Sequence, residues 1–375
     1  MSASPVIQTL AELVRINSIN PAFPGGTPEA GVVAFCRAFF TAAGIETREQ
    51  EVLPGRSNLV AVLPGRQPGR RLVLEAHMDT VGVSGMTIPP FQPELSGGRL
   101  FGRGACDTKG GLAAMMHALA SLERAGITPP CEVWVAAAVD EEFSYRGVLK
   151  LCEGLEAAAA VVAEPTLMRL VTASKGCLRW RIVCRGVAAH SSKPETGVNA
   201  ICNMARVILT LQDDIQRMAG RSHPLVGRPT LSPGTITGGT QVNIVPDYCC
   251  VELDRRLIPG EEVDDVMAHY AAVIGTMDVT ARMEPPMLTD VPLETPAHSP
   301  IARTASEVLE EMGLDGSACG VPFGSDASKL SRAGVPSVVV GPGSIDRAHG
   351  DTEYVECEQV EQALEFYRSL MLRFE

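Results

Sequence analysis

The chain has 375 residues, of which 45% are apolar, and its formal net charge is -12. This length exceeds the usual size of a single hydrophobic core and predicts two domains. The acidic balance and the lack of a Lys/Arg-rich patch exclude the basic surface of a nucleic-acid-binding protein, and no membrane partner is expected. Eleven cysteines without C-x-x-C spacing or a signal peptide indicate reduced thiols and a cytoplasmic location.

The predicted elements alternate between helices and apolar runs at both ends of the chain. Ser4-Pro5 and the apolar periodicity after it predict an opening helix, and Thr27-Pro28 begins a second helix that runs to Gly44. In chain order, the further elements are apolar runs at 72–76, 131–139, 157–163 and 336–340, and helices at 112–124, 300–313 and 357–372. This alternation predicts an α/β sandwich.

The middle of the chain has a different pattern. A strand at 177–183, a helix at 198–218, strands within 235–257 and a helix after Glu261 predict an inserted α+β unit. We therefore expect a discontinuous main domain at 1–174 and 286–375, with a smaller domain at 175–285.

The tripeptide His77-Met78-Asp79 follows the apolar run 72–76. Alternate side chains of a strand share one face, so His77 and Asp79 are expected to point the same way. Asp79 could then hold the second ring nitrogen of a metal-bound His77. The short motif by itself fits a core histidine satisfied by a neighbouring carboxylate equally well.

A glycine-rich segment, Gly102 to Gly111, places Asp107 just before the helix at 112–124. This turn could deliver Asp107 to a point where chain ends converge. The neighbouring Cys106 has no dedicated local base, so it is interpreted as a small buried side chain rather than a nucleophile. His117, inside the apolar helix, is interpreted as a core or helix-face residue.

Three consecutive carboxylates, Asp140, Glu141 and Glu142, end the run 131–139. A charge run is usually a solvated face, which is the interpretation favoured for Asp140. Glu141 and Glu142 are expected to need compensating partners instead. Glu164 ends the next run, and His349 follows the last one. Because ligands of open α/β sheets bind beyond the carboxyl ends of the strands, these groups could share one cleft.

Together, these motifs resemble a known family over nearly the whole chain. The ordered set is His77-Met78-Asp79, Gly-Arg-Gly-Ala-Cys-Asp107, Asp140-Glu141-Glu142, Glu164-Pro165 and the late His349. It resembles the dinuclear-zinc amidohydrolases that include acetylornithine deacetylase, succinyl-diaminopimelate desuccinylase, aminoacylase and glutamate carboxypeptidase. Glu75-Ala76 departs from the family's common wording, in which a glycine often precedes the histidine.

The resemblance implies one metal ion bound by His77 and Glu164, a second bound by Glu142 and His349, and Asp107 bridging both. Imidazole and carboxylate ligands suit zinc, with cobalt or manganese as alternatives. A bridging carboxylate sets two such ions roughly 3.5 to 4 Å apart. The resemblance further implies a cis peptide between Asp107 and Thr108, an arrangement that is rare outside proline.

The resemblance also implies amide hydrolysis by a metal-activated water, with Glu141 as the general base that later protonates the departing amine. Asp79 is expected to assist catalysis from beside His77. Adjacent Glu141 and Glu142 can divide the two duties of base and ligand only if an irregular backbone turns both into the same cleft.

The inserted unit is implied to be a lid domain that forms a homodimer through its sheet. Within Gly186 to Ser192, His190 would help to stabilise the tetrahedral oxyanion. Asn243 and Arg256 match positions of substrate contact, and Arg256 could grip a carboxylate through two parallel hydrogen bonds. Arg255 is expected to face the opposite way.

Further substrate contacts are expected from the main domain, at Gly324, Ser325, Gly343 and Ser344. The leading hypothesis is an acetylornithine deacetylase-like hydrolase of N-acyl amino acids. A metallo-carboxypeptidase or dipeptidase acting on short peptides is the enzymatic alternative, and a metal-binding protein without turnover is the non-enzymatic one. Glu141 speaks against the last, because a structural site has no use for an unligated acid beside the metal.

Overall fold

The computed structural model describes residues 3–375 and divides them into two compact units. The first unit runs to Thr172 and includes Thr295–Cys319 and Ser325–Glu375; the second comprises Ala173–Glu294 and Gly320–Gly324. The second unit thus extends past residue 285, because β15 (Leu288–Asp290) pairs antiparallel with β9 (Gly176–Arg185). Gly320–Gly324 lies with it, and the Lys175 amide donates a hydrogen bond to the Val321 carbonyl.

The first unit is built on a mixed sheet with the strand order β1-β2-β6-β3-β7-β18-β8. Its strands are β1 (Glu46–Leu53), β2 (Arg56–Leu63), β3 (Arg71–His77), β6 (Glu132–Ala138), β7 (Ala159–Val162), β18 (Ser337–Val339) and β8 (Val171–Ser174), which leads the chain into the second unit. The α/β fold expected from the sequence is confirmed. The edge strand β1 escaped prediction because its side chains are polar and largely exposed.

The central strands all run in one direction. β3 is parallel to β6 and to β7, and β18 is parallel to β7. Their carboxyl ends therefore meet at one edge of the sheet, as the positions of the polar groups indicated. Strands in such a core are buried on both faces, which explains the continuous Val- and Ala-rich runs in place of an alternating pattern.

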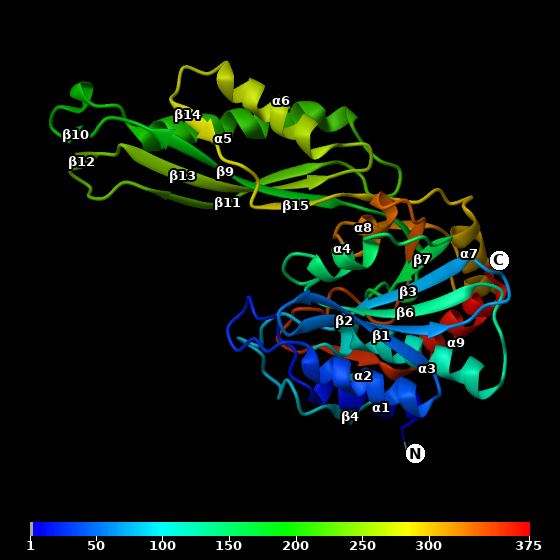
Figure 1. Ribbon diagram of the computed structural model, residues 1–375. Coiled ribbons are helices and arrows are strands. Elements are labelled where there is room, and N and C mark those ends of the chain that lie inside the picture. The colour runs from blue at the N-terminus through cyan, green and yellow to red at the C-terminus, as the bar shows by residue number, and fades with distance from the viewer. Residues whose placement is uncertain (1–2) are drawn as a thin grey trace. The chain divides into compact units, whose positions relative to one another are not determined.

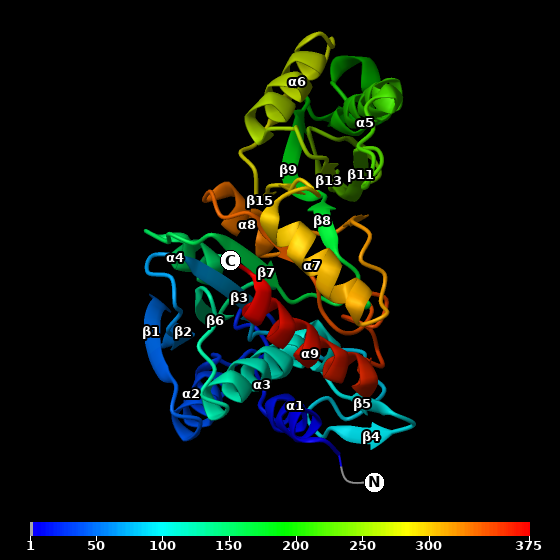
Figure 2. The same ribbon diagram turned by 90° about the vertical axis from the view of Figure 1, so that its right-hand side faces the viewer.

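Helices cover both faces of this sheet. The helices of the first unit are α1 (Pro5–Arg15), α2 (Ala30–Ala42), α3 (Gly110–Arg124), α4 (Arg146–Cys152), α7 (Pro300–Glu311), α8 (Ala327–Arg332) and α9 (Cys357–Arg373). α1, α2, α3 and α9 lie on one face, and α4 and α8 lie on the other (Figure 1). α9 packs along α3 (Figure 2), and the core between them is apolar.

A small antiparallel sheet supports the segment before Asp107. β5 (Arg99–Phe101) pairs with β4 (Glu94–Ser96) on one side and with β19 (Tyr354–Glu356) on the other. The glycine-rich segment begins directly after β5, so the pairing of β5 with β19 fixes the position of its first residues. Residues that are 250 positions apart in the chain are thereby brought together.

The second unit is an antiparallel sheet with the order β11-β13-β9-β14 and with β15 beside β9. Its elements are β9, β10 (Ala189–His190), α5 (Ala200–Arg217), β11 (Thr230–Gly238), β12 (Ile244–Val245), β13 (Tyr248–Leu257), α6 (Val263–Gly275), β14 (Ala281–Met283), β15 and β16 (Leu293–Glu294). Within this unit, α5 and α6 cover one face of the sheet (Figure 1), and burial alternates along β13. Alternation is typical of a sheet with one covered face.

Within residues 3–375, no helix combines the length and apolar character that crossing a membrane requires.

Candidate metal centre

Five side chains meet beyond the carboxyl ends of the first unit's central strands. His77 Nε2 lies 3.0 Å from Asp107 Oδ1 and 4.0 Å from Glu164 Oε1. His349 Nε2 lies 3.2 Å from Asp107 Oδ2 and 3.2 Å from Glu142 Oε2. They form two groups whose potential ligand atoms lie within 4.8 Å of one another. We call His77, Asp107 and Glu164 the first metal position, and Asp107, Glu142 and His349 the second.

Asp107 belongs to both groups, as the resemblance implied for a bridging ligand. It lies in a five-residue irregular helical turn, Ala105–Lys109, and the peptide between Asp107 and Thr108 is cis, as expected. The other four side chains come from the ends of different strands: His77 ends β3, Glu142 follows β6, Glu164 follows β7, and His349 lies between β18 and β19.

Glu353 holds the Asp107 turn and was not recognised from the sequence. Its Oε1 accepts hydrogen bonds from the backbone amides of Cys106 and Asp107, at 2.9 and 3.1 Å. Its Oε2 accepts one from Arg103 at 2.6 Å. Glu353 is fully buried. Nothing in its local sequence separates it from a surface acid, since its partners lie about 250 residues earlier.

The ring of His77 is oriented by the backbone of Asp79. His77 Nδ1 lies 2.9 Å from the Asp79 carbonyl oxygen and 3.7 Å from its carboxylate Oδ1. Because Nδ1 donates to this carbonyl, Nε2 is directed at Asp107, where a metal ion would take the place of its proton. The expectation that Asp79 holds the second ring nitrogen is met by its carbonyl, which frees its carboxylate for another task.

That task is to hold the turn after β6. Asp79 Oδ1 accepts the backbone N–H of Glu141 at 3.1 Å, and Oδ2 accepts that of Glu142 at 3.2 Å. Two adjacent glutamates are thus anchored through their main chain while their side chains stay available. Glu141 Oε2 lies 4.0 Å from His77 Nε2, yet Glu141 belongs to neither ligand group.

The solvated position expected for Asp140 is wrong. Asp140 is completely buried and has a positive φ of 70°. Its Oδ2 accepts hydrogen bonds from Ser144 and from Arg146, both at 2.6 Å. Asp140 Oδ1 lies 3.1 Å from an Arg56 nitrogen. Hydrogen-bond donors from the protein therefore surround the Asp140 carboxylate, which the sequence pattern had placed in water.

The cluster concentrates negative charge in a buried place. Burial raises the pKa of Glu164 and Glu142, and the neighbouring Asp107 carboxylate raises both further. Burial would also raise the pKa of Asp107, but hydrogen bonds from His349 and His77 outweigh it and hold that pKa below its usual range. The hydrogen bonds that His349 donates to the Asp107 and Glu142 carboxylates raise the pKa of His349 to about 11. Divalent cations would supply the positive charge that such a group of carboxylates needs.

The residues present fit two metal ions. Within residues 3–375, the buried atoms Glu142 Oε1 and Glu164 Oε1 have no hydrogen-bond partner. Buried carboxylate oxygens are normally satisfied, so an unpartnered one in each ligand group indicates a missing electropositive partner. Imidazole nitrogens and carboxylate oxygens are the donors that zinc, cobalt and manganese accept.

Two glycines let the backbone after β18 approach Glu164 and Cys106 closely. Gly341 and Gly343 are both required: a Cβ on Gly341 would lie 2.5 Å from the Glu164 carbonyl oxygen, and one on Gly343 would lie 2.5 Å from Cys106 Sγ. The carbonyl of Ser344 accepts the Cys106 thiol at 3.3 Å. Gly343 and Ser344, expected as substrate contacts, thus also pack against the chain beside the ligands.

A second pair of buried acids was also missed. Glu75 and Asp326 are nearly inaccessible, and none of their four carboxylate oxygens has a hydrogen-bond partner within the described chain. Burial raises the pKa of both, and that of Asp326 reaches about 7. Ser325 beside it is buried, and its carbonyl accepts the Lys329 ammonium at 3.0 Å.

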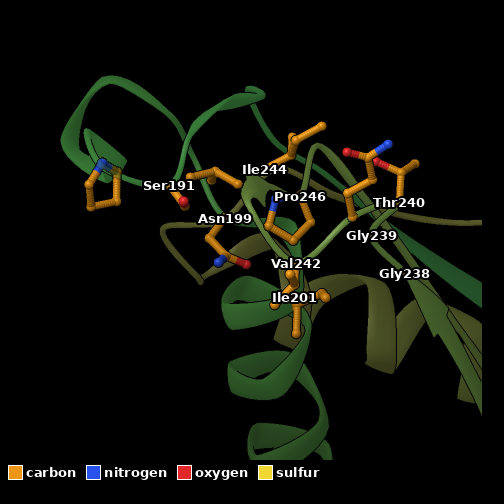
Figure 3. Close-up of a pocket in the computed structure, with 12 residues that line it drawn as sticks. Ser191, Asn199, Ile201, Gly238, Gly239, Thr240, Val242, Ile244 and Pro246 are labelled. Carbon is orange, nitrogen blue, oxygen red and sulfur yellow. The ribbon is translucent and has the colours of Figure 1, made fainter.

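In the second unit, His190 ends β10 and Asn243 directly precedes β12, and both residues are exposed. His190 pairs with Ile244 in the β10–β12 ladder, and the Ser191 amide donates to the Asn243 carbonyl at 3.1 Å. His190 Nδ1 lies 2.8 Å from the Ser192 hydroxyl. Beside them is a hollow of about 570 Å³, lined by Asn199, Thr240 and Val242 among others (Figure 3).

Arg255 and Arg256 face opposite ways, as expected. Arg255 is buried and donates to Glu261 at 2.7 Å, whereas Arg256 is partly exposed and donates through Nε to Asp254 at 2.9 Å. Gly324 belongs to this unit, and a Cβ there would lie 1.8 Å from an Asp290 carboxylate oxygen. A side chain at position 324 would clash with Asp290, which explains in part why this residue is a glycine.

The chain is similar to known proteins over most of its length. A model of peptidase family M20/M25/M40 matches residues 73–373. Acetylornithine deacetylase from Myxococcus xanthus is 30% identical over 374 residues, covering 94% of this chain and 93% of that protein. The acetylornithine deacetylase from Proteus mirabilis is 30% identical over 335 residues, covering 85% and 83% of the two chains.

Solved structures share the fold. Aminopeptidase PepT from Bacillus cereus superposes with a TM-score of 0.81 at 23% identity, covering 98% of this chain and 97% of that one. A dinuclear metal binding peptidase of the M20 family from Bacillus subtilis gives 0.75 at 16% identity, covering 99% and 98%. The chain therefore belongs to peptidase family M20/M25/M40 and is a metal-dependent hydrolase of that family.

Proposed function

We propose that the protein hydrolyses the amide bond of an N-acyl amino acid, with an activity like that of acetylornithine deacetylase. The observation that carries this proposal is a largely buried glutamate, Glu141, that is left outside two candidate ligand groups joined by Asp107. An amide needs an activated water, a polarised carbonyl and a proton for the departing amine. A dinuclear centre with a free carboxylate can meet all three needs.

The metal positions would hold two divalent ions, with zinc the first choice and cobalt or manganese the alternatives. When bound, such ions supply Lewis acidity, which polarises a carbonyl and lowers the pKa of water. His77 and Glu164 would complete the first position, Glu142 and His349 the second, and Asp107 would serve both. Asp79 keeps the His77 tautomer through its carbonyl and anchors the glutamate turn through its carboxylate.

Glu141 would take the proton from the attacking water and return it to the leaving amine. Burial raises the pKa of Glu141 well above its ordinary value, which makes the carboxylate a stronger base than one in water. The nearby imidazole of His77 opposes that rise. A general base must lie near the reacting water without being consumed as a ligand, and this role is supported by the place of Glu141, 4.0 Å from His77 Nε2 and outside both ligand groups.

Residues outside the metal positions would bind the rest of the substrate. His190 would donate a hydrogen bond to the developing oxyanion, and Arg256 would exchange its Asp254 partner for the substrate carboxylate. Asn243, Gly324 and Ser325 are proposed contacts, as are Gly343 and Ser344. Homodimer formation through the second unit and a cytoplasmic location complete the proposal.

A carboxypeptidase or dipeptidase is the second candidate function. The M20 metallo-carboxypeptidase Sso-CP2 from Sulfolobus solfataricus shares the fold with a TM-score of 0.78 at 17% identity, over 99% of each chain. Likeness at that identity concerns the fold alone. The relatives at 30% identity are named deacetylases, and they favour the acyl amino acid over the peptide.

The test is amine release from a matched panel of N-acetyl, N-succinyl and N-aminoacyl amino acids. The protein is reconstituted with zinc or cobalt and compared with a chelated sample. Preference for the simple acyl compounds, abolished by chelation, would support the proposal. Preference for the aminoacyl compounds would replace it by a peptidase, and silence across the whole panel would overturn it.

The role of Arg256 can be isolated with the best substrate and its carboxamide analogue. Arg256→Ala should raise KM for the carboxylate substrate by roughly 10- to 100-fold, since a charge-assisted bidentate bond contributes a few kcal/mol. The KM for the carboxamide analogue should change little. An equal loss on both compounds would assign Arg256 a structural role.

A further inference from the structure

A buried polar network joins the N-terminal segment of the first unit to the turn that carries Glu141 and Glu142. Asn20 Nδ2 donates to Asp79 Oδ2 at 2.7 Å and to Asp140 Oδ1 at 2.9 Å. Asn20, Asp79 and Asp140 are all completely inaccessible to solvent. The Asn20 amide group thus bridges two acids. Asp140 directly precedes Glu141 and Glu142, and Asp79 accepts hydrogen bonds from the backbone of both glutamates.

Hydrogen bonds hold the backbone and the side-chain amide of Asn20 in one orientation. Its backbone amide donates to the Thr80 carbonyl at 2.9 Å, and the Thr80 amide donates to the Ser18 carbonyl at 3.0 Å. The side-chain Oδ1 accepts the Ala22 amide at 3.0 Å. Because both side-chain donor bonds and the acceptor are used, the orientation of the amide group is determined and its Nδ2 must face the two carboxylates.

Arg56 holds Asp140 from the other side. Its guanidinium makes two hydrogen bonds to the Glu29 carboxylate, at 2.8 and 2.5 Å, and a third nitrogen lies 3.1 Å from Asp140 Oδ1. Glu29 is fully buried, and only 7% of the Arg56 side chain is exposed. A buried ion pair of this kind is seldom a large source of stability, but it restricts geometry strongly.

The network acts on a strained point of the backbone. Asp140 has a positive φ, a conformation that a non-glycine residue keeps only when its surroundings impose it. The next two residues carry the free carboxylate and a metal ligand, and both of their amides end on Asp79. The direction of both glutamates therefore depends on how firmly Asp79 and Asp140 are held.

We propose that Asn20 and Arg56 are positioning residues for the catalytic turn: by fixing Asp79 and Asp140 they direct Glu142 to the second metal position and keep Glu141 free of the metals. The role assigned to Glu141 rests on the proposed function. The direction of Glu142 is a geometric claim, and it can be tested without any substrate.

The experiment titrates the metal-free protein with Co²⁺ and follows visible absorption. Glu164→Ala and Glu142→Ala, each weakening one position, assign the two binding steps. Asn20→Ala and Arg56→Gln should weaken cobalt binding at the second position by roughly 10- to 100-fold, the usual effect of removing a partner behind a ligand. Binding at the first position should change by less than about threefold, because the His77 ring is held by a backbone carbonyl.

A matched control separates positioning from general loosening. Val308→Ala removes buried apolar volume from α7, far along the chain from the network, and should lower Tm without touching a polar group. Its cobalt affinities should equal those of the unaltered protein at a temperature where both are folded. Kinetics with the best substrate add a second readout: Asn20→Ala should lower kcat at least tenfold, with KM within about twofold.

Selective loss at the second position would support the proposal. Equal weakening of both positions, or a loss matched by Val308→Ala, would overturn it by showing loosening alone. Unchanged cobalt binding and unchanged kcat in Asn20→Ala would also overturn it. A protein that binds cobalt as expected but hydrolyses nothing would refute the proposed function while leaving the positioning claim tested.

Discussion

The two groups of candidate residues differ sharply in how they are held. In the first unit, His77 and Asp107 are almost fully buried, and the partners of Asp107 are His77, His349 and Glu353, which are distant in the chain. In the second unit, His190 and Asn243 are exposed, and their contacts come from Ser191, Ser192 and the two-stranded β10–β12 ladder. The chemistry is therefore preorganised where burial and hydrogen bonds fix the ligands. Changes to the proposed metal ligands of the first unit should lower metal content, whereas changes to His190 and Asn243 in the second should affect kinetics alone.

The largest effect is expected from Asp107, which belongs to both metal positions. Asp107→Ala should remove both ions and reduce turnover to the background rate, because each position loses a ligand at once. Metal analysis of the purified protein measures this. Asp346→Ala, at an exposed acid in the loop that carries His349, is the control and should keep both ions. Retention of one ion at unaltered affinity in Asp107→Ala would contradict bridging.

Glu141 separates chemistry from metal binding within the same unit. Glu141→Gln should lower kcat by roughly 10²- to 10⁴-fold, the usual contribution of a general base, with both ions retained. Glu142→Gln is the matched neighbour and should instead weaken metal binding. The assignment fails if Glu141→Gln loses metal and Glu142→Gln does not.

His190 tests the other side of the comparison. His190→Ala should lower kcat by roughly 10²- to 10³-fold, as expected when a donor to an oxyanion is removed. Its Tm and metal content should stay unchanged, since substitutions at exposed positions usually alter stability by less than about 0.5 kcal/mol. Ser192→Ala removes the partner of its ring and should have a smaller effect. A fall in metal content would show that the two regions are not independent.

The smallest effect concerns His117, which the sequence placed in the core or on a helix face. It is half-buried on α3, and its Nε2 lies 2.8 Å from the Thr9 hydroxyl. Burial, assisted by Arg124, lowers its pKa from 6.5 to about 4. The unfolded chain therefore takes up this proton more readily than the folded one between those values.

Its contribution to stability is present above pH 6.5 and is lost as the pH falls towards 4. Partial exposure limits the effect to about 1–2 kcal/mol. Denaturant unfolding of the unaltered protein and of His117→Gln at pH 7 and pH 4.5 measures it, and the variant should lose less stability over that interval. Parallel losses in both proteins would exclude His117 as the cause.

Much of the fold could be predicted because its signals are local. The apolar runs that became β3, β6, β7 and β18 are continuous, and each polar group stands directly at a run's end. The helices α1, α7 and α9 followed from a proline after a serine or from apolar periodicity. β1 and β2 were both missed: β1 is an exposed edge strand with no apolar pattern to detect, whereas β2 has a buried apolar run that was not recognised.

The ligand set followed from sequence, but the way it is held did not. Local sequence and the resemblance to a family together pointed to His77, Asp107, Glu142, Glu164 and His349 as candidate ligands, and the structure brings these five side chains together. Only tertiary structure decided that Asp140 is buried, that Asn20 bridges it to Asp79, and that Glu353 anchors the Asp107 turn. The physical reason is that the burial and hydrogen bonding of a carboxylate depend on its partners in space. For Asp140 and Asp107 some of these partners lie 120 and 246 residues away.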